Sequence, residues 1–310
     1  MIAITSIGMT VSDMERSLDF YTTVLFFQKI FDREVTGIEF ERLYGLAAGR
    51  SRVVKLQLGK ETIQLNEFLT LKGRSIPTDS QSNDRWFQHI AIVVRDMEQA
   101  YQHLQHYQVF QVSSNPQTLP ASNPVSGGIQ AFYFKDPDGH NLELIHFPQG
   151  KGDPKWQGSS DVSFVESPES LFLGIDHTAI VVADTVASLS FYGDRLGMKL
   201  EQQSQDSGME QEHLSGVSGV RVQITSLKAS AGLGIELLEY LEPIGRPMPV
   251  DTRASDLWFC YIEATNAPAI ANQPSKANSP PISIDVSSDL GLDQLEIQDP
   301  DGHRVRLLNQ

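Results

Sequence analysis

The chain has 310 residues, of which 40% are hydrophobic, enough for two folded domains or one large one. Its 39 acidic residues outnumber its 24 basic ones, and the formal charge of −15 makes nucleic acid and anionic membrane surfaces poor partners. The single cysteine, Cys260, excludes an internal disulfide and favours a reducing compartment. Neither a signal peptide nor an apolar run of about 20 residues is visible, so we expect a cytoplasmic protein.

The first predicted elements are a strand at residues 4–11 and a helix after it. Segment 12–15 has the pattern of a capping box, in which Ser12 would cap the helix. Strands at 51–58 and 61–68 follow, joined by a two-residue hairpin turn. The order of elements in this first stretch is therefore β-α-β-β-β.

The same order of elements recurs along the chain. Residues 88–96 and 176–184 match almost position for position, and both resemble the first predicted strand. We infer four modules and a tandem duplication, with a Gly/Ser/Pro-rich linker between the halves. The halves span 1–148 (modules 1–85 and 86–148) and 172–310 (modules 172–256 and 257–310), and the linker spans 149–171.

An Asp-Pro-Asp-Gly-His turn closes the second and fourth modules. It occupies residues 136–140 and again 299–303, and we interpret it as a hairpin turn whose histidines are structural. The strands after the two turns differ in charge, because one carries Glu143 where the other carries Arg306. The fourth module is the least regular, since its helix would have to pass Pro268 and Pro274.

Two modules each carry one histidine and one glutamate in positions that suit a metal ion. His89 and His177 lie near the start of their modules' first strands, and Glu143 and Glu236 lie on later strands. Because side chains alternate along a strand, each of these polar groups falls on a face with small or apolar neighbours. A histidine and a carboxylate on neighbouring strands can bind a divalent cation.

Four β-α-β-β-β modules with this histidine and glutamate resemble the vicinal oxygen chelate superfamily. That superfamily includes glyoxalase I, extradiol dioxygenases, and fosfomycin- and bleomycin-resistance proteins. The resemblance implies an α+β fold in which modules pair into two cup-shaped mixed β-sheets flanked by helices, with the metal in a cup. The corresponding positions are Ser6 and Gln64 in module one, His89 and Glu143 in module two, His177 and Glu236 in module three, and Phe259 or Tyr261 with Arg306 in module four.

The pairing of modules decides how many sites are complete. If modules pair in sequence, each cup receives half a set, and Arg306 opposes a cation in the second cup. If module two pairs with three and one with four, one cup collects His89, Glu143, His177 and Glu236, and the other collects none. We prefer the second arrangement, which gives one complete site.

The resemblance implies a divalent metal ion, with Zn, Ni, Fe and Mn all open. We expect a metal-dependent glyoxalase-like lyase or isomerase that acts on a small molecule with adjacent oxygens, with Glu143 or Glu236 as the catalytic base. An extradiol-type dioxygenase acting on an aromatic substrate is one alternative. A metal-free small-molecule binding protein of the bleomycin-resistance type is the other. The protein would be a monomer or a homodimer.

Overall fold

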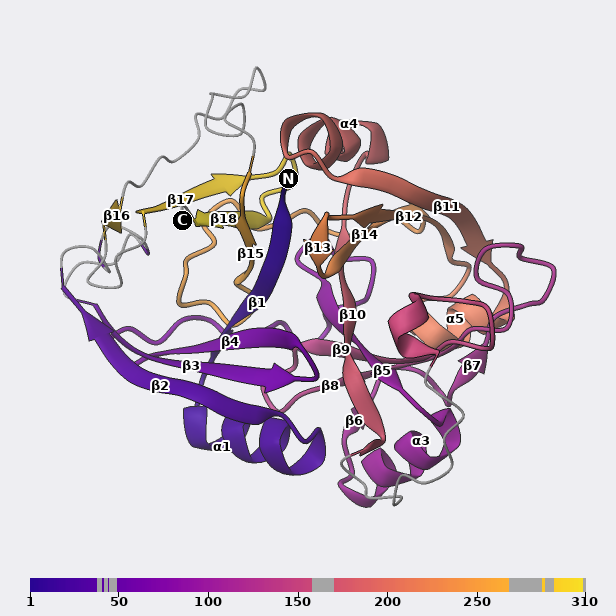
Figure 1. Cartoon of the computed structure of the whole chain (residues 1–310), viewed down its shortest axis with the longest axis horizontal. Coiled ribbons are helices and arrows are strands. Elements are labelled where there is room, and N and C mark those ends of the chain that lie inside the picture. Colours follow the sequence, from indigo (N-terminus) through magenta and orange to yellow (C-terminus); the bar gives the residue numbers. More distant parts are fainter. Residues whose placement is uncertain are drawn as a thin grey trace.

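The computed structural model describes residues 1–37, 41, 44, 49–157, 170–267, 286–287 and 293–308. These residues form two mixed β-sheets with short helices packed against them (Figure 1). This is the α+β architecture that the repeat and the family resemblance predicted. No helix in the described ranges is long and apolar enough to cross a bilayer.

The first sheet combines the first and fourth modules. In spatial order it contains β16 (Val286–Ser287), β17 (Asp293–Gln298), β18 (Arg304–Leu308), β15 (Cys260–Thr265), β1 (Ala3–Val11), β4 (Glu61–Phe68), β3 (Arg50–Leu58) and β2 (Gln28–Thr36), while β13 (Ala231–Gly232) also pairs with β1. The two modules meet where β1 and β15 run antiparallel, so strands from the two ends of the chain lie side by side (Figure 1).

The second sheet combines the second and third modules in the same way. In spatial order it contains β11 (Lys199–Ser207), β12 (Arg221–Lys228), β14 (Gly234–Glu242), β10 (Phe172–Val181), β5 (Gln88–Val94), β9 (Asn141–His146), β8 (Gln130–Lys135) and β6 (Phe110–Gln111), while β7 (Gln117–Thr118) also pairs with β8. The antiparallel pair β5–β10 joins the modules. The preferred pairing of two with three and one with four is therefore confirmed.

Short helices follow the first strand of the first three modules. They are α1 (Met14–Asp19) with the π-helical turn η1 (Phe20–Val24), α3 (Met97–His106), and α4 (Thr185–Leu189) with the π-helical turn η4 (Ser190–Arg195); α5 (Met209–Ser215) lies later in module three. The cap of α1 is Asp13, not Ser12, because the Asp13 carboxylate accepts from the Arg16 backbone N–H, while the Ser12 hydroxyl donates to Asp138 at 2.5 Å. The helix expected near Pro268 and Pro274 falls outside the described residues.

Strand alternation separates the apolar core from the cavity face, as the pattern of β5 illustrates. Ile90, Ile92 and Val94 belong to a large apolar cluster that draws residues from all four modules. Ala91 and Val93, on the opposite face, belong to a separate cluster. The face that carries His89 is thus distinct from the face that packs against the helices, as predicted.

Two reciprocal clasps tie the halves of the chain together. Arg74 donates to the buried Asp256 carboxylate from the other half, and Arg246 donates to the buried Asp84 in return. A Cβ atom on Gly73 would lie 1.9 Å from the Ser255 carbonyl oxygen, so only glycine fits there. The sequence carries Gly-Arg at 73–74 and again at 245–246, and Asp-x-Trp-Phe at 84–87 and again at 256–259, so each Gly-Arg contacts the Asp-x-Trp-Phe segment of the other half.

Candidate metal centre

The four predicted site residues lie on four adjacent strands in the middle of the second sheet. Glu236 is on β14, His177 on β10, His89 on β5 and Glu143 on β9. The histidine rings have centroids 5.7 Å apart. The structure therefore brings together the set that sequential pairing of modules would have divided.

The register of these strands explains the arrangement. Ala179 lies directly between His89 on one neighbouring strand and Glu236 on the other. Ala91 lies in the same way between His177 and Glu143. The two halves of the site are thus related by an approximate twofold axis, and a small side chain separates each histidine from a glutamate. Methyl groups at these two positions leave room between the larger polar groups.

Three of the four side chains converge tightly. Ligand atoms of His89, Glu143 and His177 lie within 4.8 Å of one another, and all three residues are buried. Glu143 Oε2 lies 3.1 Å from His89 Nε2 and 3.6 Å from His177 Nε2. Glu236 Oε2 lies 3.3 Å from His177 Nε2, and its side chain is more exposed, at 21% against 7% for Glu143. Glu236 is therefore at the open side of the cluster.

Glu236 is held in place by a hydroxyl group. Ser226 on β12 lies directly across from it in the sheet, and the Ser226 Oγ donates to Glu236 Oε1 at 2.7 Å. One carboxylate oxygen thus faces the serine and the other faces His177.

A β-bulge adds a carboxylate behind His177. Between Ile175 and His177, β10 advances two residues while β5 advances one, so Asp176 is the extra residue. Strict alternation would place the Asp176 side chain on the opposite face of the sheet from His177. The bulge instead brings the Asp176 side chain to the same face as His177. Asp176 Oδ2 lies 3.1 Å from His177 Nδ1, and Asp176 Oδ1 accepts from the Trp156 indole N–H at 2.5 Å. Sequence reasoning missed both residues, because alternation predicts the opposite orientation for Asp176.

This contact fixes which nitrogen of His177 is available. In the singly protonated ring, a proton on Nδ1 that donates to Asp176 leaves the lone pair of Nε2 facing Glu143 and Glu236, where a cation can take the place of the second proton. Burial disfavours the charged imidazolium, but Glu236, Asp176 and Glu143 outweigh it and raise the pKa of His177 to about 10. The same negative field would attract a divalent cation.

Buried nitrogens without hydrogen bonds indicate that the residues present fit a metal ion. His89 Nδ1, His89 Nε2 and His177 Nε2 are buried and make no hydrogen bond in the described part of the chain. Buried polar groups are normally satisfied, so such atoms call for a partner. Two imidazoles and one or two carboxylates form a donor set that suits Zn, Fe, Ni or Mn.

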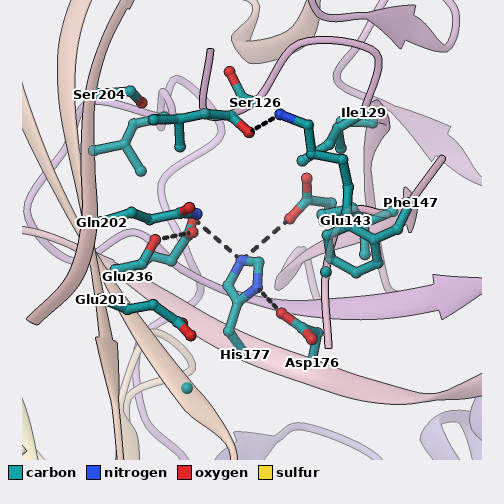
Figure 2. A pocket seen from close by; sticks show the side chains of 18 of the residues that line it. Ser126, Ile129, Glu143, Phe147, Asp176, His177, Glu201, Gln202, Ser204 and Glu236 are labelled. Carbon is teal, nitrogen blue, oxygen red and sulfur yellow. Dashed lines mark hydrogen bonds and ion pairs between the residues drawn. The ribbon is translucent and has the colours of Figure 1, made fainter. Parts of the chain in front are cut away.

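The cluster opens into a cavity of about 320 Å³. Figure 2 shows His177 between Glu236 and Glu143, with Gln202 and Ser204 on one side of the cavity and Ile129 and Phe147 on the other. Residues 151–155, within the stretch predicted as a linker, also line it. A volume of this size is at the lower end of the range for small-molecule sites.

The first sheet carries the same four positions with different chemistry. Tyr261 lies opposite Gly8 as His89 lies opposite Ala179, so Tyr261 and not Phe259 is the equivalent of His89. Arg306, the equivalent of Glu143, is almost fully buried, with its guanidinium 3.5 Å from the centre of the Tyr261 ring.

The partners of Arg306 complete this arrangement. Its Nε donates to Glu296 at 2.9 Å, and Gln64 donates to the Tyr261 hydroxyl at 2.5 Å. The cation of Arg306 thus lies in the cup formed by the first sheet. The equivalent position in the cup formed by the second sheet holds the carboxylate of Glu143. This is the charge reversal expected from comparing Glu143 with Arg306.

The histidines of the two turns are structural, as predicted. His140 Nδ1 contacts Asp136 at 2.8 Å, and its Nε2 lies 2.7 Å from the Leu257 carbonyl oxygen in the other half. His303 makes the matching contact with Asp299 at 2.9 Å. Both rings are buried away from the cluster of His89 and His177.

Comparison with known proteins places the chain in a family. The model of the Glyoxalase/Bleomycin resistance protein/Dioxygenase superfamily matches residues 3–144 and 174–271. The chain belongs to this superfamily. A curated relative, a 2-epi-5-epi-valiolone epimerase from Actinomyces sp, is 28% identical over 154 residues, which cover 48% of this chain and 81% of that protein.

Solved structures of the superfamily share the fold over nearly the whole chain. Glyoxalase I from Zea mays is similar with a TM-score of 0.58 and 16% identity, over 100% of this chain and 92% of that one. A putative dioxygenase from Bacillus subtilis has a TM-score of 0.55 and 12% identity, over 99% of this chain and 84% of that one. At these identities the likeness concerns the fold alone.

Proposed function

We propose that this protein is a metal-dependent isomerase or epimerase that moves a proton on a carbon next to a carbonyl group. The substrate would be a small molecule with two adjacent oxygens. The observation that carries the proposal is the buried convergence of His89, Glu143 and His177 beside a cavity. Membership of the superfamily and the similarity to an epimerase support it.

His89, His177 and Glu143 would hold the metal ion, with Glu236 at its open side. When bound, a divalent cation polarises the adjacent substrate oxygens and stabilises the negative charge that develops on them. Glu143 is the better ligand of the two glutamates, because it contacts both histidines and is the more buried. It therefore has the least freedom to move.

Glu236 is the better candidate for the base. It contacts one histidine only, lines the cavity and is the more exposed of the two glutamates. Ser226 holds one of its oxygens, so the carboxylate has a fixed orientation. A positioned carboxylate of this kind can accept a proton from a substrate carbon and return it to the same or a neighbouring atom.

The two glutamates give a direct test. We expect metal-loaded wild-type protein in D₂O to exchange deuterium into an α-hydroxyketone at the carbon next to the carbonyl, followed by NMR. Glu236→Gln should keep the metal and lose exchange by about a hundredfold or more, whereas Glu143→Gln should lose the metal. Exchange that persists in both variants at the wild-type rate would refute the assignment.

A second candidate function follows from the same three residues. Two histidines and one carboxylate are also the ligand set of non-haem iron oxygenases. Oxygen consumption by the Fe(II)-loaded protein with a catechol, without deuterium exchange by the Zn- or Ni-loaded protein, would favour a dioxygenase.

A further inference from the structure

One wall of the cavity is a polar stripe on β11. Gln202, Ser204 and Asp206 alternate along this strand, so they share the face that lines the cavity. The stripe is continuous with the candidate metal centre, because Gln202 pairs across the sheet with Ser226 and Ser226 pairs with Glu236. Figure 2 shows Gln202 directed toward the space next to His177, with Ser204 farther from His177 on the same wall.

Asp206 is a buried carboxyl group at the end of this stripe. Its Oδ1 accepts from the Asn123 amide at 2.7 Å, and its Oδ2 accepts from the Ser126 hydroxyl at 3.4 Å. Burial raises the pKa of Asp206, and the Glu236 charge adds to the rise. No lysine or arginine of the described residues lies within ion-pair distance of it. The neighbours of Asp206 are thus an amide and a hydroxyl group, both of which can also hydrogen-bond to a substrate hydroxyl. Among the described residues, no cation balances the negative charge of the Asp206 carboxylate.

The cations that line the cavity already have partners. They are Lys151, Lys155 and Lys228. The Lys151 ammonium donates to two backbone carbonyls of the facing loop, each at 2.8 Å. Lys155 pairs with Glu61 at 2.9 Å, and Lys228 lies 3.4 Å from an Asp153 oxygen. Two of the three lysines are therefore paired with carboxylates, and the third, Lys151, is held by neutral carbonyl oxygens of the facing loop.

The remaining charges also disfavour an anion. A divalent cation would be balanced by Glu143 and Glu236, which leaves no net positive charge at the centre. Asp206 lies on the β11 wall, and Glu201 also lines the cavity. The carboxylates that line the cavity outnumber its lysines, so a phosphate or carboxylate on the substrate would lose its hydration in a field that is negative overall, which is costly in a buried site.

The opposite wall is apolar. Leu119, Ile129, Ile145 and Phe147 line it, and Ile129 and Phe147 face the polar stripe in Figure 2. A bound molecule would therefore have one edge that hydrogen-bonds to amide and hydroxyl groups and one edge that packs against hydrocarbon.

We propose that the cavity takes an uncharged, polyhydroxylated ketone of about one ring in size, and that Gln202, Ser204 and Asp206 determine this specificity by binding its hydroxyl groups. The proposal rests on the proposed function, since it concerns the substrate of the same centre.

Calorimetry with two matched pairs of probes tests the proposal on the zinc-loaded protein. A pentahydroxycyclohexanone should bind about tenfold or more tightly than 2-hydroxycyclohexanone, which has the same ring and adjacent oxygens but one hydroxyl. Xylulose should bind about tenfold or more tightly than xylulose 5-phosphate, in which a charged ester replaces the terminal hydroxyl. Each tenfold step corresponds to about 1.4 kcal/mol.

Variants of the stripe should change these preferences selectively. Asp206→Asn and Ser204→Ala should weaken the pentahydroxycyclohexanone by about tenfold and leave 2-hydroxycyclohexanone unchanged. Gln202→Lys should improve xylulose 5-phosphate by about the same factor. Gln205→Ala, on the other face of β11, is the matched control and should change none of the four affinities.

The outcomes separate this proposal from the proposed function. Equal or tighter binding of the phosphate ester, no preference for hydroxyls, or no binding of either hydroxylated probe would overturn the specificity proposal even if deuterium exchange is intact. Preferences as expected without deuterium exchange on any ketone would instead overturn the proposed reaction. Thermal melting of each variant identifies any loss of folding, in which case Ser204→Ala and Gln202→Lys decide.

Discussion

Asp176 should control metal affinity through His177 without touching the metal. In Asp176→Asn the side chain keeps its shape but has one acceptor oxygen instead of two. The native carboxylate accepts from the Trp156 indole at 2.5 Å and contacts His177 Nδ1 at 3.1 Å, so one of these partners must then face an NH₂ group. If that partner is His177, its proton moves to Nε2, the atom that faces the glutamates.

The magnitude follows from the role of such outer contacts. Loss of a carboxylate behind a ligating histidine typically weakens metal binding about 10- to 100-fold, or about 1.4–2.7 kcal/mol. Trp156→Phe should have a smaller effect in the same direction, because Asp176 keeps its charge and its contact with His177. Competition with a chromophoric chelator measures the affinity, and ¹⁵N shifts of the imidazoles report which His177 nitrogen carries the proton.

The duplicated scaffold supplies the control for this experiment. Thr5 occupies the bulge of β1 that corresponds to Asp176, in the cup without the histidines. Thr5→Ala should therefore leave metal affinity and the imidazole shifts unchanged. Metal affinity of Asp176→Asn within twofold of the wild-type value, with an unchanged His177 proton position, would refute the reasoning.

Two further predictions concern stability. Asp136 outweighs the burial of His140 and raises the pKa of His140 to about 9 from 6.5, so this contact stabilises the fold below about pH 6.5 and is lost as the pH rises through 9. Because the pKa values of His177 and His303 are raised as well, the contribution of His140 is the difference between wild type and His140→Gln in chemical unfolding from pH 6 to pH 10, and it should be on the order of 3 kcal/mol. Gly73→Ala should lower the free energy of unfolding by about 2 kcal/mol or more, because its Cβ would meet the Ser255 carbonyl at 1.9 Å. Gly193→Ala, whose Cβ would meet nothing closer than 3.8 Å, should stay close to wild type, and equal stability of the two variants would contradict the clasp.

Much of the fold could be predicted from the sequence because the duplication repeats it. The two copies of the Asp-Pro-Asp-Gly turn and of the strand with His89 or His177 located the modules and the faces of their strands. The pairing of modules could not be derived in this way, because either arrangement satisfies strand alternation. It is decided by the contact between β5 and β10, which brings together residues far apart in sequence.

The candidate centre was predictable to the level of its four polar residues but not of its surroundings. Asp176 was missed because a bulge overrides alternation, and no residue type marks that bulge. Trp156 was missed because it lies in a stretch that composition describes only as a linker. Asp206 was missed because β11 has polar residues on both faces, so its sequence does not mark one face as functional. Only the order of strands in the sheet shows which face lines the cavity.

Metal content is the most direct test of the central claim. Purified protein, stripped, refilled with a divalent metal and freed of excess, should contain about one ion per chain by elemental analysis. His89→Ala and His177→Ala should retain little of it, whereas Ser6→Ala, at the position in the first cup that corresponds to His177, should retain it in full. Substoichiometric metal in the wild-type protein would favour a metal-free binding protein, and full metal in the two histidine variants would contradict the site described above.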